Sequence, residues 1–76
     1  MDFYGKEVHG LKITLKAARV NAGLTQEEAA EKLGVSRDRL LRWENGITEP
    51  PYTAVINMCK VYGCSVDYLI LPAIST

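Results

Sequence analysis

Apolar residues recur at intervals of three and four along most of the chain, and a glycine follows each such stretch. In residues 11–22, Leu11, Leu15, Ala18 and Ala22 follow one another at intervals of four, three and four. This spacing places the side chains on one face of an α-helix, and a glycine just after the last periodic residue is typical of a helix C-cap. The pattern therefore predicts a first helix over residues 11–22 that ends at Gly23.

A second helix is predicted over residues 25–33. Thr25 is followed three residues later by Glu28, an arrangement in which each side chain accepts a hydrogen bond from the other residue's backbone N–H. Gly34 ends the stretch after about two turns. The side chains expected to face the core are Ala29, Ala30 and Leu33.

A third helix is predicted over residues 37–45, directly after a tight turn. Ser36 is a good N-cap, and Asp38 lies in the first turn, where the helix dipole favours a negative charge. Two short helices joined in this way predict a helix-turn-helix over residues 25–45.

Two further helices are predicted toward the C-terminus. The pair Pro50–Pro51 suits a first helical turn, and the apolar spacing after it continues until Gly63. Ser65 and Asp67 repeat the cap and dipole pattern and predict a short fifth helix that Pro72 ends.

The predicted elements make one all-α domain, a compact five-helix unit over residues 11–71. The 76 residues leave no room for a second domain, and 47% hydrophobic with 24% charged residues is typical of a globular chain that buries a core. Residues 1–10 form an N-terminal extension whose structure the sequence does not define, and residues 72–76 form a C-terminal tail. No segment alternates with the period of a strand.

Charge and cysteine content narrow the function classes. Nine basic and nine acidic side chains give a formal net charge of zero, so a nucleic-acid partner requires positive charge concentrated on one face. Cys59 and Cys64 do not form a CxxC motif, and we expect reduced thiols in a cytoplasmic protein. The chain shows no secretory signal and no apolar run long enough for a membrane span, so we expect no membrane partner.

No catalytic constellation is visible in the sequence. We find no serine, histidine and acid set, no phosphate-binding loop and no cluster of metal ligands around the single histidine, His9. The sequence therefore predicts no enzyme, no metal and no cofactor.

Several separated motifs resemble those of the phage repressor and Cro family, also called XRE-like. These are GLTQEEAAEKLGVS at residues 23–36, WENG at 43–46, EPP at 49–51 and GCSVDYL at 63–69. The resemblance covers residues 12–71, and its strength lies in the agreement of several motifs in their spacing.

This resemblance implies a lambda-repressor-like fold and a function in sequence-specific binding of double-stranded DNA. The protein would be a transcriptional regulator that acts as a repressor. Residues 37–45 would form the recognition helix in the major groove, with the second helix across the DNA backbone. The family also implies a structural ion pair between Arg19 and Glu44.

The helical period tests this placement independently. At 100° per residue, Leu40 and Trp43 mark the buried side of residues 37–45. Three arginines and one aspartate between positions 37 and 42 give this short segment a charge of plus two in a neutral chain. The side chains on or beside the opposite flank are Arg37, Asp38, Arg39, Leu41, Arg42 and Asn45.

Three of these residues are candidates for base contact. Arg42 either donates two hydrogen bonds to guanine or pairs with Asp38 at i, i+4, and both arrangements can coexist with Asp38 orienting Arg42. Asp38 either accepts a bond from cytosine or serves only the helix dipole. Arg37 either reaches a base edge or phosphate or is a solvated surface arginine.

Four residues are candidates for phosphate contact. In the family, a glutamine at the position of Gln26 touches phosphate and braces side chains of the recognition helix. The hydroxyl of Ser36 can bind phosphate besides capping its helix. The predicted position of Arg39 suits a phosphate contact and plain solvation equally well. Asn45 resembles the family's phosphate-binding asparagine and equally suits a C-cap.

Two departures from the family keep another function class open. Leu41 stands where relatives usually carry a polar residue, and residues 47–49 lack the basic side chains of many relatives. A protein-interaction module, such as an antitoxin or an accessory phage protein that binds another polypeptide, is the alternative. A homodimer on a palindromic operator is a hypothesis that rests on the apolar C-terminal residues Tyr68, Leu69, Ile70, Leu71, Ala73 and Ile74.

Overall fold

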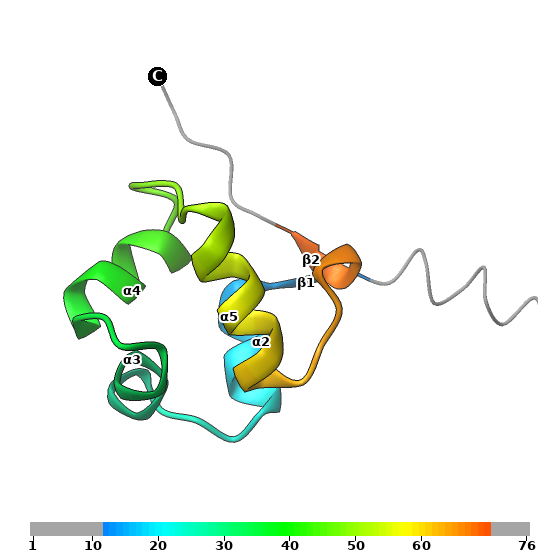
Figure 1. Ribbon diagram of the computed structural model, residues 1–76, viewed down its shortest axis with the longest axis horizontal. Helices are drawn as coiled ribbons and strands as arrows, with labels where there is room; N and C mark the ends of the chain where they lie inside the picture. Colours follow the sequence, from blue (N-terminus) through cyan, green and yellow to red (C-terminus); the bar gives the residue numbers. More distant parts are fainter. Residues whose placement is uncertain (1–11, 71–76) are drawn as a thin grey trace, which may run out of the picture.

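The computed structural model describes residues 12–70, and four α-helices make up most of this region (Figure 1). The elements in chain order are β1 (Ile13–Thr14), α2 (Leu15–Asn21), α3 (Gln26–Leu33), α4 (Arg37–Glu44), α5 (Tyr52–Tyr62), the 3-10 helix η1 (Val66–Tyr68) and β2 (Leu69–Ile70). The all-α class is confirmed, although the predicted number of five helices is not. The extension at residues 1–10, Leu11 and the apolar residues after Ile70 lie outside the described residues.

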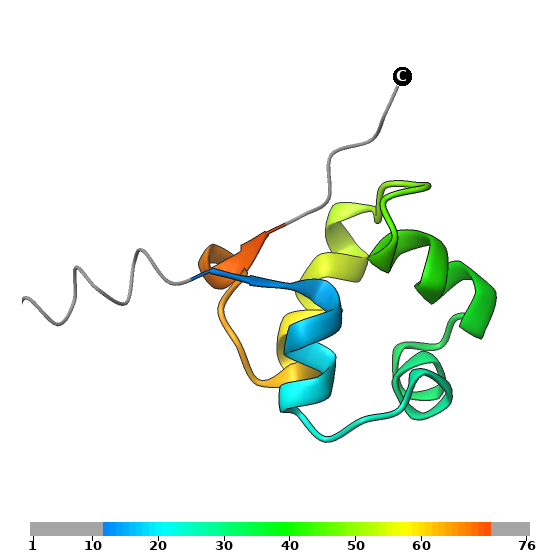
Figure 2. The ribbon, with the colours of Figure 1, turned by 180° about the vertical axis from the view of Figure 1, so that it is seen from behind.

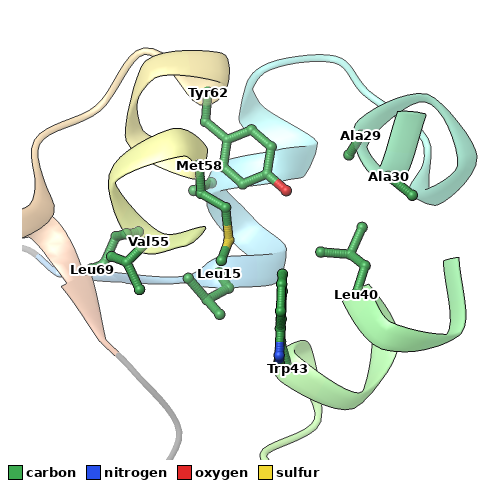
Figure 3. Close-up of a cluster of buried hydrophobic side chains, with 10 residues drawn as sticks. Leu15, Ala29, Ala30, Leu40, Trp43, Val55, Met58, Tyr62 and Leu69 are labelled. Carbon is green, nitrogen blue, oxygen red and sulfur yellow. The ribbon is translucent and has the colours of Figure 1, made fainter. Parts of the chain in front are cut away.

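Helices α2 and α5 lie side by side, with α3 and α4 on one side of them and the β1–β2 pair on the other (Figures 1 and 2). The core lies between the four helices, and Figure 3 shows its side chains converging from all of them. The buried apolar residues are Leu15, Ala18, Ala29, Ala30, Leu40, Trp43, Val55, Met58, Tyr62 and Leu69. Among residues 12–70, no helix combines the length and apolar character that crossing a membrane requires.

The prediction that the first helix covers residues 12–14 is wrong. Ile13 and Thr14 are extended and pair in parallel with Leu69 and Ile70. Helix α2 begins only at Leu15, because the Thr14 hydroxyl accepts a hydrogen bond from the Ala17 N–H at 3.0 Å and caps the helix there. The periodic apolar pattern gave no sign of this pairing, which joins positions far apart in the chain.

The prediction of a short fifth α-helix is also wrong. The Ser65 hydroxyl does cap the segment by accepting from the Asp67 N–H at 3.2 Å. The helix makes only one 3-10 turn, η1, before the chain extends into β2. The extended backbone buries Leu69 in the core and leaves Ile70 exposed, an alternation of sides that a helix cannot provide.

The caps around α3 confirm the sequence prediction. The Thr25 hydroxyl accepts from the Glu28 N–H at 3.1 Å, and the Glu28 carboxylate accepts from the Thr25 N–H at 2.9 Å. At the other end Gly34 has a φ of 73°, a conformation that is unfavourable for residues with a Cβ. Helix α3 is thus held to eight residues between two local signals.

Candidate nucleic-acid interface

A three-residue turn joins α3 to α4 and sets the angle between them. The N–H of Val35 donates to the carbonyl of Ala30 at 3.0 Å, which closes the end of α3. The Ser36 hydroxyl accepts from the Arg39 N–H at 3.1 Å and starts α4. Because both helix ends are satisfied by hydrogen bonds within the turn, the two helices meet in one defined arrangement.

Two large side chains hold α4 against the rest of the domain. Leu40 is 0% exposed and Trp43 is 4% exposed, and both project from α4 into the core opposite α3 and α5 (Figure 3). This confirms the buried side that the helical period predicted. The flank that carries Asp38, Arg42 and Asn45 is therefore turned to solvent.

A buried ion pair ties α4 to α2. The Arg19 Nε donates to Glu44 Oε2 at 2.7 Å and its Nη2 donates to Glu44 Oε1 at 3.2 Å. The third nitrogen, Nη1, donates to the carbonyl of Leu24 at 3.0 Å. The hydrogen bond to Glu44 raises the pKa of Arg19. The structure confirms the pair that the family resemblance implies, and this pair fixes the C-terminal end of α4.

The N-terminal end of α4 is connected to α3 through Arg37. Arg37 Nη2 donates to Gln26 Oε1 at 3.0 Å, and Arg37 Nε lies 3.3 Å from Glu27 Oε2. The contact between Gln26 and Arg37 is the bracing that the family resemblance implies. It holds the Arg37 guanidinium beside the first turn of α3.

Arg42 is oriented by an acid on its own helix. Its Nε donates to Asp38 Oδ2 at 2.9 Å, and both side chains are mostly exposed. Within residues 12–70, Nε is the only Arg42 atom in a side-chain hydrogen bond. The two terminal nitrogens of the guanidinium have no hydrogen-bond partner among these residues, and they are the atoms that a guanine edge requires.

Arg39 differs from both neighbours. It is exposed and forms no ion pair within the part of the chain that the structure describes. It lies instead beside a surface groove of about 500 Å³ between α4 and the loop that precedes α5. The groove is lined by Ser36, Asp38, Arg39, Arg42, Trp43, Thr48, Glu49 and Pro51.

The seven predicted site residues thus form one surface in three parts. Four of them line the groove, while Gln26 and Arg37 lie together at the junction of α3 and α4. Asn45 is exposed and occupies the C-cap of α4, where its N–H donates to the Leu41 carbonyl at 2.9 Å. Its position as a C-cap is confirmed, and a phosphate contact stays a prediction.

Sequence reasoning missed two residues of this surface. Glu27 was not among the predicted site residues, yet it pairs with Arg37. Thr48 lines the groove although its loop was noted only for lacking basic residues. The pairing of Glu27 depends on the angle between two helices, so no local pattern could reveal it. The sequence signal for this loop was Gly46, which follows α4 and lies two positions before Thr48.

Two short helices with a tight turn between them, the second exposing an arginine-bearing flank, define a helix-turn-helix domain. The chain belongs to the helix-turn-helix family, because the family model described as Helix-turn-helix matches residues 15–69. This confirms the resemblance found in the motifs.

Curated relatives agree with this assignment. The chain is 39% identical over 56 residues to the HTH-type transcriptional regulator ImmR of Bacillus subtilis, a match that covers 74% of this chain and 44% of the relative. It is 39% identical over 56 residues to the uncharacterized HTH-type transcriptional regulator YqaE of the same organism, with 74% and 48% covered. A match to MJ0272 of Methanocaldococcus jannaschii, also described as an uncharacterized HTH-type transcriptional regulator, is 35% identical over 57 residues and covers 75% of this chain and 86% of the relative.

The chain spans less than half the length of the two Bacillus relatives. No solved structure matches the chain.

Proposed function

We propose that this chain binds double-stranded DNA in a sequence-specific manner as part of a cytoplasmic transcriptional regulator that acts as a repressor. The observation that carries the proposal is the solvent side of α4, which is held in place by Leu40 and Trp43 and carries three exposed arginines on or beside the opposite flank. In the proposed complex α4 lies in the major groove and α3 crosses the backbone. The similarity to three relatives that are named HTH-type transcriptional regulators supports it.

The geometry supports a division of labour among the site residues. Arg42, oriented by Asp38, donates its terminal nitrogens to a guanine. Arg37 reaches a base edge or a phosphate from its position beside Gln26. Phosphates are contacted by hydroxyl, amide and guanidinium donors that lie around these two arginines. The proposed phosphate ligands are Gln26, Ser36, Arg39 and Asn45.

The same surface also carries acids, which limits the electrostatic part of binding. Glu27, Asp38 and Glu49 lie among or beside the arginines. Each phosphate contact releases counterions and steepens the fall of affinity with salt. We therefore propose a modest affinity per domain that a homodimer on a palindromic site raises. Sedimentation that shows only monomer at tens of micromolar would exclude the homodimer.

Selection from a random DNA pool, followed by binding titrations, tests the proposal. We expect an enriched sequence, and we expect a variant with Arg37→Ala and Arg42→Ala to lose affinity for it and to show a shallower dependence on log salt. The matched control removes two exposed lysines on helices other than α3 and α4, Lys16→Ala and Lys60→Ala. If the arginine variant binds DNA as well as wild type does, the protein-interaction module becomes the better description.

A further inference from the structure

Two cysteines lie close together at the C-terminal end of α5. Cys59 lies in the last turns of the helix, and Cys64 follows Gly63, the residue at which the helix ends. The N–H groups of Gly63 and Cys64 both donate to the Cys59 carbonyl, at 2.8 and 3.0 Å. With Gly63 at a φ of 72°, this is a Schellman-type ending, in which the residue after the glycine folds back beside the residue five positions earlier.

The surroundings of the two thiols fit a reactive pair. Both cysteines are free and half-buried, and both pack against the edge of the core. A disulfide requires Cα atoms about 4.4 to 6.8 Å apart. The 3.0 Å hydrogen bond from the Cys64 N–H to the Cys59 carbonyl holds the two residues within such reach. The side chain of Cys64 also acts directly on the Cys59 thiol, whose pKa it raises after the larger effect of burial.

We propose that Cys59 and Cys64 form an oxidation site, at which a peroxide converts the two thiols to an intramolecular disulfide. The sulfur of Cys64 attacks one peroxide oxygen, the O–O bond breaks, and a sulfenic acid and one water result. The sulfur of Cys59 then attacks the Cys64 sulfur, the S–O bond breaks, and the hydroxyl leaves as a second water. Two thiols and one hydrogen peroxide thus give one disulfide and two waters.

The order of the two steps follows from the environment of Cys59. Burial raises the pKa of Cys59, and the thiolate is the form that attacks. Cys64 therefore reacts first and Cys59 resolves the sulfenic acid. The bond closes a ring across the end of α5 and ties this helix to the segment that leads into η1. A closure of this size corresponds to a rise in Tm of roughly 10–20 °C in a domain this small.

Oxidation with hydrogen peroxide, followed by intact-mass and peptide analysis, tests the proposal. We expect wild type to lose about 2 Da, as two thiols become one disulfide, to stay monomeric on a non-reducing gel, and to return to its original mass with a dithiol reductant. In Cys59→Ser the reaction should stop at a sulfenic acid on Cys64 that dimedone traps. In Cys64→Ser it should be slow.

A pair of glycine variants tests whether the helix ending brings the thiols together. Gly63 and Gly23 both have a positive φ, and an added Cβ meets nothing within 4 Å at either position. Gly63→Ala therefore disturbs the helix ending by backbone strain alone, and Gly23→Ala applies similar strain elsewhere. We expect disulfide closure to slow severalfold in Gly63→Ala only. Equal rates in both variants, or a wild type that accumulates sulfenic acid or disulfide-linked dimers, would overturn the proposal.

Discussion

The ion pair between α2 and α4 and the ion pairs at the candidate interface use the same chemistry in opposite surroundings. The side chains of Arg19 and Glu44 are 6% and 2% exposed. Those of Arg42 and Asp38 are 52% and 76% exposed, and the pair of Arg37 with Glu27 is similar. Burial therefore distinguishes two kinds of ion pair. The buried pair holds α4 in place, whereas the exposed pairs can exchange partners.

The difference follows from the free-energy cost of separating the two charges of each pair. The charges of Arg19 and Glu44 are removed from water, so separating them leaves a buried charge uncompensated. Arg19 also donates to the Leu24 carbonyl, which satisfies the remaining side of the guanidinium. The exposed pairs are screened by solvent and contribute little to folding. Their arginines can be transferred to DNA at small cost.

The largest effect is expected from Glu44→Gln, which removes the charge that compensates the buried Arg19. We expect the free energy of unfolding to fall by about 3–5 kcal/mol, a large part of the stability of a small domain. Urea denaturation measures it. The matched change at the exposed pair, Glu27→Gln, should cost less than about 1 kcal/mol. Similar losses in the two variants would contradict the distinction between the pairs.

The next largest effect concerns Tyr62, which projects from α5 into the core (Figure 3). It lies close enough to Glu44 and Arg19 for their charges to act on its pKa. Its hydroxyl is buried and has no hydrogen-bond partner within residues 12–70. Burial, followed by the charge of Glu44, raises the pKa of Tyr62 to about 12 from its ordinary value of 10.0. The folded protein therefore holds this proton more tightly than the unfolded chain does.

The sign of the pH dependence follows. Below pH 10 the phenol is protonated in both states and this contribution is intact. Between about pH 10 and 12 the unfolded chain loses the proton first, so stability falls with rising pH, by about 2–3 kcal/mol in all. Denaturation across this range should show the loss in wild type and a smaller one in Tyr62→Phe. If Tyr62→Phe shows the full loss of stability, groups other than Tyr62 cause the pH dependence.

Local signals made the helix-turn-helix predictable. The reciprocal cap of Thr25 and Glu28 and the positive φ of Gly34 depend on neighbouring residues only, and the side of α4 that is buried follows from its own period. The parallel pairing of β1 with β2 escaped prediction, because a two-residue strand is too short to show a periodic pattern. The contact of Arg37 with Glu27 escaped it for a related reason, since only the packing of α3 against α4 creates it.

The two arginines at the groove extend this contrast to the interface itself, because Arg42 is paired with Asp38 and Arg39 has no ion pair among residues 12–70. On a selected DNA site, Arg42→Ala should reduce discrimination at one base pair by about 1–3 kcal/mol. Arg39→Ala should instead weaken binding to all sequences and reduce the slope of log affinity against log salt by about one. Titrations on the selected site and its single-base variants, at several salt concentrations, separate these effects. If both variants lose base discrimination equally, the pairing of Arg42 with Asp38 does not give the two arginines different roles in DNA binding.

The smallest effect on folding is expected from Asp38→Asn, which opens the exposed pair without removing Arg42. The lost i, i+4 interaction and the lost charge near the start of α4 together cost about 0.5–1.5 kcal/mol of stability.

The effect of Asp38→Asn on DNA binding is the more informative measurement. If Asp38 acts by orienting Arg42, Asp38→Asn should relax discrimination at the base pair that Arg42 reads, and it should have no such effect when Arg42 is already alanine. A double-mutant cycle measures this coupling, and additive losses would mean that Asp38 contacts DNA independently of Arg42.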